Sequence, residues 1–186
     1  MMRIFLGLGS NMGDRHNHLI LGCELISDLS DTSIQYTSPV YKTPPLYNTQ
    51  QSSFLNMVIE IATKFSPHEL IAIIKDIEAN LGRDIENGHN LPRPLDIDIL
   101  AYGTVQISDG KLTLPHPGIF ERKFVLQPWS DIAEDFILVG MNESIKFLLQ
   151  NTSDKSDITL TQFTVENLLE QQVMVKNTTQ QMYLAT

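Results

Sequence analysis

The chain has 186 residues, of which 42% are hydrophobic, and a formal net charge of −9 at pH 7. This length and composition predict one globular domain, or one domain with a tail, that can bury a core. The acidic balance argues against a general nucleic-acid binder, because no surplus of positive charge is available to neutralise a phosphate backbone. It does not exclude a single nucleotide, for which a few local arginines and Mg²⁺ are enough.

The features that report on location favour the cytoplasm. Cys23 is the single cysteine, so an internal disulfide is excluded, and its helical spacing with apolar neighbours predicts a small core residue. The N-terminal run over residues 2–9 is too short and too broken by glycine for a signal peptide, and no apolar run reaches the length that spans a membrane. We therefore expect a cytoplasmic protein with no membrane partner. We also expect a monomer and no nucleic-acid partner.

Four apolar runs predict the strands of a sheet. They span residues 3–8, 34–41 with an interruption at Pro39, 54–62 and 96–102. Two helical patterns lie between them. One follows the capping Asp14 to about residue 29, and the other begins at a capping box formed by Ser66 and Glu69 and ends near Gly82. A turn over residues 9–13 and irregular loops over 43–53 and 83–92 complete this part of the chain.

The order strand, helix, strand, strand, helix, strand is that of a ferredoxin-like sandwich, an α+β fold with helices on one face of an antiparallel sheet. We expect an added hairpin over residues 105–114 and further helices over 121–132 and 144–150. After about residue 151 the composition turns to Thr, Ser, Gln and Asn with weak periodicity. The sequence therefore predicts a domain over 1–150 and a C-terminal appendage of unknown role over 151–186.

The segment over residues 91–100 contains two aspartates separated by one apolar residue. Its period-two pattern predicts a strand on which Asp96 and Asp98 project from one face, about 6.6 Å apart along the axis. Two adjacent carboxylates repel each other unless a cation lies between them. Their hard oxygen atoms suit Mg²⁺, which takes its remaining ligands from water and phosphate. The alternative is a strand with a solvated polar face.

Basic residues near this pair suggest a site for an anionic group. Arg83 and Arg93 bracket the second irregular loop, where they could form a movable clamp on phosphates, although each could also be a solvated loop charge. His116 stands between two prolines and shortly before Arg122, which would suit an anionic ligand, although a loop histidine is usually a surface residue. The sequence shows neither zinc-ligand spacing nor a nucleophile with a convincing base.

The glycines at positions 7, 9 and 13 could be a dinucleotide-binding turn. However, the last glycine comes one residue late for that fingerprint, and the expected βαβ unit is not evident. We interpret these glycines as a structural turn that lets the backbone approach a neighbour or a ligand closely.

Seven segments within residues 1–135 form a further pattern, in which each is weak alone. They are residues 8–11 with 13–15, 38–45, 54–56, 77–78 with 81–83, 92–99, 114–117 and 121–128. In this order they resemble the 6-hydroxymethyl-7,8-dihydropterin pyrophosphokinase family of folate biosynthesis. The ferredoxin-like fold of that family agrees with the order of elements read above.

The resemblance implies transfer of a diphosphate from ATP to the hydroxymethyl group of a reduced pterin, which leaves AMP. By similarity, two Mg²⁺ ions bound by Asp96 and Asp98 bridge the triphosphate and the attacking hydroxyl. The implied catalytic residues are Arg83, Arg93, Asp96 and Asp98. The implied ATP-binding residues are Glu78, Arg83, Arg93, Ile99, His116 and Arg122. The implied pterin-binding residues are Thr43, Pro44, Leu46, Phe54, Asn56 and Phe124.

The chain departs from the family pattern at several positions. Ile85 stands in place of a second loop arginine, Asn90 and Leu91 replace an aromatic and a small residue, and Phe54 replaces a common tyrosine. The first three changes concern the contacts of the loop over 83–92, which we expect to be mobile without ligands and to close on both substrates. Phe54 keeps the stacking surface and loses a hydroxyl.

Two rival functions remain beside the enzyme. A non-catalytic ferredoxin-like module could bind a nucleotide for regulation, but it would not need paired metal carboxylates beside a mobile clamp. A metal-dependent phosphate-ester hydrolase would need more carboxylate or histidine ligands than this chain clusters.

Overall fold

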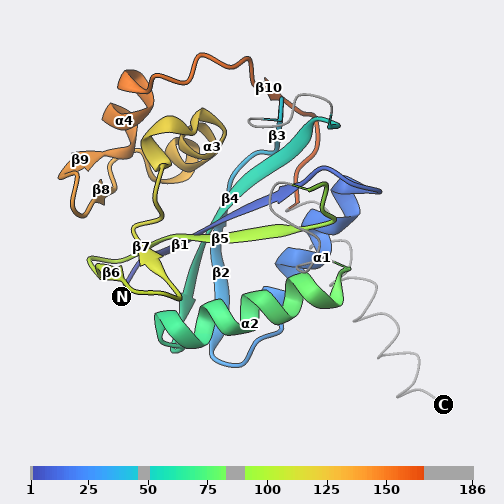
Figure 1. The fold of residues 1–186 in the computed structure, drawn as a ribbon, viewed down its shortest axis with the longest axis horizontal. Coiled ribbons are helices and arrows are strands. Elements are labelled where there is room, and N and C mark those ends of the chain that lie inside the picture. The colour runs from blue at the N-terminus through green and yellow to red at the C-terminus, as the bar shows by residue number, and fades with distance from the viewer. Residues whose placement is uncertain (1, 46–50, 83–90, 166–186) are drawn as a thin grey trace, which may run out of the picture.

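A six-stranded antiparallel sheet lies at the centre of the computed structural model, which describes residues 2–45, 51–82 and 91–165 (Figure 1). Its strands are β1 (Ile4–Ser10), β2 (Thr32–Thr37), β3 (Tyr41–Thr43), β4 (Phe54–Thr63), β5 (Asp96–Tyr102) and β10 (Thr159–Leu160). The strand order is β10-β3-β4-β1-β5, and β2 also pairs with β4. β2 and β3 pair with different parts of β4, so the predicted interruption at Pro39 is confirmed.

Two helices cover one face of the sheet. They are α1 (Arg15–Ser27) and α2 (Pro67–Asn80). The side chain of Asp14 accepts the amide hydrogen of Asn17 at the start of α1, and Ser66 and Glu69 form a capping box at the start of α2. Both helix starts are therefore as predicted, because each is determined by local chemistry that the sequence displays.

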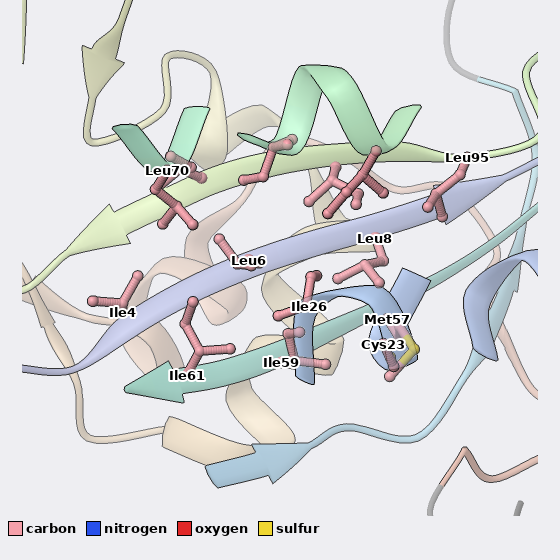
Figure 2. Close-up of a cluster of buried hydrophobic side chains, with 14 of the residues drawn as sticks. Ile4, Leu6, Leu8, Cys23, Ile26, Met57, Ile59, Ile61, Leu70 and Leu95 are labelled. Atoms are coloured by element: carbon pink, nitrogen blue, oxygen red, sulfur yellow. The ribbon is translucent and has the colours of Figure 1, made fainter. Parts of the chain in front are cut away.

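The apolar faces of these helices meet the sheet in the first of two cores (Figure 2). The labelled core residues are Ile4, Leu6, Leu8, Cys23, Ile26, Met57, Ile59, Ile61, Leu70 and Leu95. Cys23 is fully buried, as predicted, and burial raises the pKa of its thiol to about 12. Leu95, Ile97 and Ile99 also face this core, which directs the aspartates between them to the opposite face.

The second face of the sheet is covered by α3 (Lys123–Ala133), with α4 (Ile145–Asn151) packed beside it. Their core contains Phe5, Val58, Leu100, Leu126 and Trp129. The expectation of helices on one face therefore holds for the ferredoxin-like unit, while the later helices add a layer on the other face. Short connections complete the fold: the hairpin of β6 (Ile107–Ser108) and β7 (Thr113–Leu114), the 3₁₀ turn Ile119–Glu121, and the hairpin of β8 (Ile137–Leu138) and β9 (Glu143–Ser144).

Two boundaries differ from the expectation. β1 includes Gly9 and Ser10, which belong to the turn that the sequence predicts. It continues this far because Gly9 pairs with Asn56 on one side and with Asp96 on the other. Partners on both sides hold these small residues in an extended conformation that their own propensities do not favour.

The expected appendage after residue 150 begins as part of the domain. Thr159 and Leu160 pair with Lys42 and Tyr41 at the edge of the sheet, and Val165 is buried in the first core. Packing against the domain therefore continues beyond the domain boundary that the sequence predicts at residue 150. A two-residue edge strand has no periodicity that a sequence pattern could reveal, and residues 166–186 lie outside the described part of the chain. Among the helices of the described residues, none is long and apolar enough to cross a membrane.

Candidate active site

A row of paired residues crosses the sheet on its second face. Asp96 in β5 lies opposite Gly9 in β1, and Gly9 lies opposite Asn56 in β4. Two residues further along β5, Asp98 lies opposite Gly7. Because residues paired across strands share a face of the sheet, the two carboxylates and the amide of Asn56 project from the same side.

This side of the sheet forms the floor of a cavity of about 240 Å³ beside the first turn of α3. The residues predicted for the site that line it are Thr43, Pro44, Phe54, Asn56, Arg93, Asp96, Asp98, His116, Arg122 and Phe124. The lining residues that were not predicted for the site are Gly7, Leu8, Gly9, Pro45, Gln51, Met57, Leu100 and Val125. The structure thus joins the two predicted substrate regions into one cavity.

Three cationic or titratable side chains face the aspartate pair. Arg93 Nη1 lies 3.2 Å from Asp96 Oδ2, and Arg122 Nη1 lies 3.9 Å from Asp98 Oδ2. His116 Nε2 lies 3.7 Å from the same oxygen of Asp98. The aspartates are therefore part of a charged, half-buried cluster, and the alternative of a simply solvated strand face is wrong.

Burial is the largest influence on the pKa values of Asp98 and His116 in this cluster. Burial and the charge of Asp96 raise the pKa of the Asp98 carboxyl, despite the nearby His116 and Arg122. Burial also lowers the pKa of His116, more than the charge of Asp98 raises it. Asp98 therefore ionises less readily in the protein than a free aspartate does, and an added cation would favour its ionised form.

An amide and an aromatic ring define the other end of the cavity. Asn56 Nδ2 donates a 2.7 Å hydrogen bond to Thr43 Oγ1, which fixes the orientation of the amide. The Arg93 guanidinium lies 6.0 Å from the centre of the Phe54 ring. A Cβ atom at Gly9 would lie only 2.6 Å from Asn56 Oδ1, so glycine is needed for this approach. This end can therefore recognise a flat heterocycle with hydrogen-bonding edges.

Asn11 links the two chain segments that lead into the site, a role that sequence reasoning missed. Its side-chain Oδ1 accepts a hydrogen bond from the backbone amide of Arg93 at 2.8 Å, and its backbone amide donates to the Arg93 carbonyl at 3.2 Å. Its Nδ2 donates to Gln51 Oε1 at 2.9 Å. Nearby, Arg15 Nη1 donates to the carbonyl of Ser53 at 2.7 Å. Both Asn11 and Arg15 belong to the family segments quoted above, which was the available signal.

Two residues predicted to bind ATP do not line the cavity. Glu78 is fully buried, and its Oε1 accepts the amide hydrogen of Ile97, between the two aspartates, at 2.7 Å. Lys75 Nζ donates to Glu78 Oε2 at 2.8 Å. Ile99 is buried in the first core. A nucleotide contact for either residue stays a prediction, while Arg83 and Leu46 lie outside the described residues.

Among the residues that the structure describes, no group of three or more His, Cys, Asp or Glu side chains is arranged to hold a metal ion. A cation bound by Asp96 and Asp98, as the sequence predicts, would have two protein carboxylates as ligands. Such a site leaves most coordination positions of a cation to water or to the oxygens of a bound substrate.

The fold is an α+β fold of ferredoxin-like architecture, and its cavity has charged groups at one end and an amide with aromatic rings at the other, which is an arrangement suited to a phosphotransferase. The family model described as 7,8-dihydro-6-hydroxymethylpterin-pyrophosphokinase (HPPK) matches residues 5–134. The chain belongs to this family, which confirms the resemblance, the fold class and the transfer of pyrophosphate in folate biosynthesis. ATP is the co-substrate of HPPK enzymes.

Curated relatives agree with this assignment. The 2-amino-4-hydroxy-6-hydroxymethyldihydropteridine pyrophosphokinase of Methylorubrum extorquens is 42% identical over 140 residues, which are 75% of this chain and 88% of the relative. The enzyme of the same name from Bacillus subtilis is 37% identical over 130 residues, which are 70% of this chain and 77% of the relative. A folate synthesis bifunctional protein of Arabidopsis thaliana is 44% identical over 130 residues, but the match spans only 26% of its length.

Solved structures support the fold. A Plasmodium falciparum HPPK-DHPS with SDX-DHP matches with a TM-score of 0.58 and 15% identity, over 81% of this chain and 43% of that chain. An HPPK-DHPS in complex with substrates matches with a TM-score of 0.61 and 13% identity, over 80% of this chain and 44% of that chain. At these identities the likeness concerns the fold alone, and this chain spans less than half of either structure.

Proposed function

We propose that the cavity between the aspartate pair and Asn56 is the place where a diphosphate passes from ATP to the hydroxymethyl group of 6-hydroxymethyl-7,8-dihydropterin. In this step the hydroxyl oxygen forms a bond to the β-phosphorus of ATP, and the bond from that phosphorus to the α,β-bridging oxygen breaks. The hydroxyl proton is released and AMP leaves with the bridging oxygen. The observation that carries the proposal is that one sheet face presents both a charged end and a heterocycle end to a single cavity.

Asp96 and Asp98 fit Mg²⁺. Their oxygens are hard donors, they lie on one face of a rigid strand, and burial together with the charge of Asp96 raises the pKa of Asp98, which a bound cation would lower. Two Mg²⁺ ions bound there with the triphosphate would neutralise developing charge and acidify the attacking hydroxyl.

We assign Arg93, Arg122 and His116 to the phosphate groups. Their side chains lie within 3.9 Å of the aspartate oxygens and line the same cavity. A guanidinium can donate two parallel hydrogen bonds to a phosphate, which orients the group as well as neutralising it. By similarity we assign Arg83, which lies outside the described residues, to the same task.

Asn56, Phe54 and Phe124 would hold the pterin. The amide of Asn56 offers a donor and an acceptor to one edge of a heterocycle, and the two aromatic rings line the same cavity. Thr43 orients this amide, and Pro44 lines the same cavity. By similarity we also assign Leu46, which lies outside the described residues, to the pterin. Positioning of both reactants in one cavity is itself a large part of the catalysis that such a site can supply.

The decisive experiment mixes the protein with Mg²⁺, ATP and 6-hydroxymethyl-7,8-dihydropterin and follows the products by chromatography. We expect AMP and the pterin diphosphate in equal amounts, and a loss of both in Asp96→Ala. Asp135→Ala is the matched control, because Asp135 is exposed and lies outside the cavity. Binding of both substrates without product would favour the regulatory module, and release of inorganic phosphate from ATP would favour a hydrolase.

Two further proposals concern the cellular location and the oligomeric state of the enzyme. We propose a cytoplasmic protein, which the buried, unpaired thiol of Cys23 supports because it is compatible with a reducing compartment. We also propose a monomer. Light scattering of the purified protein tests the second proposal.

A further inference from the structure

The segment that follows α4 touches two walls of the cavity. Residues 152–161 run from the end of α4 to the outer edge of the sheet, where β10 lies beside β3 (Figure 1). We call these residues the strap. The strap lies beyond residues 5–134, which the family model matches, and no part of the mechanism described above uses it.

At its first end the strap caps the start of α3. The boundary residue Arg122 makes no side-chain capping hydrogen bond, and instead Asp154 Oδ2 accepts the amide hydrogen of Lys123 at 2.8 Å. A carboxylate in this place satisfies an open amide and interacts favourably with the helix dipole. Lys123 Nζ donates to the carbonyl of Ser156 at 3.0 Å, and the amide of Ser156 donates to Asp154 Oδ1 at 2.9 Å. The capping carboxylate is thus itself held in place.

The amide that Asp154 caps belongs to Lys123, and both neighbours of Lys123 in the chain line the cavity. Arg122 and Phe124 flank Lys123, and both line the cavity, with Arg122 Nη1 3.9 Å from Asp98 Oδ2. If the first turn of α3 frays, the helix backbone no longer fixes the positions of these two side chains. The cap on Lys123 therefore affects the position of a side chain at the phosphate end of the site and of another at the pterin end.

At its second end the strap pairs with the strand that forms the opposite wall. Thr159 and Leu160 pair with β3, and Thr161 donates to the carbonyl of Val40 through its amide at 3.0 Å and through Oγ1 at 2.9 Å. β3 ends at Thr43, which accepts the hydrogen bond from Asn56. The strap therefore ties the start of α3 to the strand that orients the pterin-binding amide.

We propose that the strap holds the two walls of the cavity, the first turn of α3 and the strand β3, in a fixed position relative to each other. In this arrangement Asp154 is a positioning residue that acts through the first turn of α3 on Arg122 and Phe124. The proposal rests on the function proposed above, because it assigns Arg122 to ATP and Phe124 to the pterin. When the competent arrangement is only partly populated, the apparent affinity for each ligand falls by that fraction. Loss of the cap should therefore weaken both substrates together and leave the rate at saturation nearly unchanged.

The test compares Asp154→Ala, Asp154→Asn and the control Asp157→Asn, which removes an equal charge from an exposed position in the same strap. For Asp154→Ala we expect KM to rise about tenfold for both ATP and the pterin, in line with the usual effect of removing a helix cap. Asp154→Asn keeps a neutral acceptor and should restore most of this loss, while Asp157→Asn should match the wild type. A purely structural role would reduce the folded fraction, and so the apparent kcat, with both KM values unchanged.

Hydrogen exchange of the Lys123 amide supplies a readout that is independent of activity. We expect faster exchange in Asp154→Ala than in the wild type, with the difference confined to the first turn of α3. Faster exchange with unchanged KM values would overturn the proposal, and so would unchanged exchange. If Asp154→Ala does not fold, Asp154→Asn decides: the small loss that it retains should appear as a parallel rise in both KM values with faster exchange of the Lys123 amide, and a rise in only one KM value or in neither would overturn the proposal. An inactive wild type would contradict the proposed function instead, and the exchange result would still test the cap.

Discussion

Gly9 lies directly opposite Asn56 in the sheet, and a methyl group at residue 9 would meet Asn56 Oδ1 at 2.6 Å. The contact is too short to exist, so the side chain of Asn56 or the backbone of β1 would have to move. Asn56 is held by Thr43 and sits in a buried position, which leaves it little room. The glycine is therefore a condition for the orientation of the amide in the cavity.

We predict that Gly9→Ala weakens pterin binding about tenfold or more while ATP binding changes little, because a misplaced amide loses hydrogen bonds worth about 1–3 kcal/mol in a desolvated site. Isothermal titration calorimetry with each substrate measures the difference. Gly110→Ala is the control, since a Cβ atom there meets nothing within 4 Å. Asn56→Ala should reproduce the loss without the steric change. Equal pterin affinity in Gly9→Ala and the wild type would reject this role for the amide.

Local sequence patterns predicted the parts of the molecule that are determined locally. The capping side chains of Asp14 and Ser66, the bounds of β5 and the shared face of Asp96 and Asp98 are all as expected. Each depends on the chemistry of a few neighbouring residues or on the period-two geometry of one strand. The family segments added the cavity residues, because their order along the chain carries information that no single motif has.

Contacts between distant segments could not be read from the sequence. The carboxylate of Glu78 reaches the amide of Ile97 only because α2 packs along the edge strand β5, and Asn11 reaches Arg93 only because β1 and β5 are neighbours. Asp154 caps a helix that begins 31 residues earlier in the chain. No spacing rule covers such pairs, since tertiary packing creates them.

The raised pKa of Asp98 gives a prediction for the protein without bound metal. The folded state holds the Asp98 proton more tightly than the unfolded state, so stability falls as pH rises from 3.8 through the raised folded pKa. We therefore expect Asp98→Asn to melt at a higher temperature than the wild type at pH 7, with the difference vanishing at low pH. Melting curves over pH 3–8 in the presence of a chelator measure this effect.

The same variant should be nearly inactive, with kcat lower by about a hundredfold or more, because a metal carboxylate contributes several kcal/mol of transition-state stabilisation. Addition of Mg²⁺ with an ATP analogue should raise the melting temperature of the wild type and leave that of Asp98→Asn nearly unchanged. A wild type that melts lower than Asp98→Asn even with Mg²⁺ and the analogue would argue against a metal at this position.

Glu78 should support catalysis through the strand that it contacts. Glu78→Ala leaves the amide of Ile97 unsatisfied in a buried place, which should cost about 1–3 kcal/mol of stability and lower kcat. Glu78→Gln keeps an acceptor and should be closer to the wild type in both respects. Urea unfolding and steady-state kinetics measure the two effects, with the exposed Asp76→Asn on the same helix as control. If Glu78→Gln instead weakens ATP binding without loss of stability, the residue contacts the nucleotide directly.

Arg93 is held in the site through both its backbone and its side chain. Its backbone is clamped by Asn11, its Nη1 lies 3.2 Å from Asp96 Oδ2, and its Nε is buried without a hydrogen-bond partner among the described residues. A guanidinium fixed in this way can meet a phosphate group with little loss of side-chain freedom when the substrate binds. We therefore expect Arg93 to act on the transferred group and not only on the affinity for ATP.

Arg93→Lys keeps the positive charge but loses the planar set of donors. We predict that it lowers the rate of the chemical step roughly 10- to 100-fold, the equivalent of one or two charge-assisted hydrogen bonds, and weakens ATP binding by less. Single-turnover kinetics and equilibrium ATP binding separate the two effects. Arg3→Lys is the matched control, because Arg3 pairs with Glu60 and does not line the cavity. An unchanged chemical rate with strongly weakened ATP binding would make Arg93 a ground-state binding residue. The same comparison on Arg83→Ala would then decide whether the loop over 83–92 supplies the catalytic cation instead.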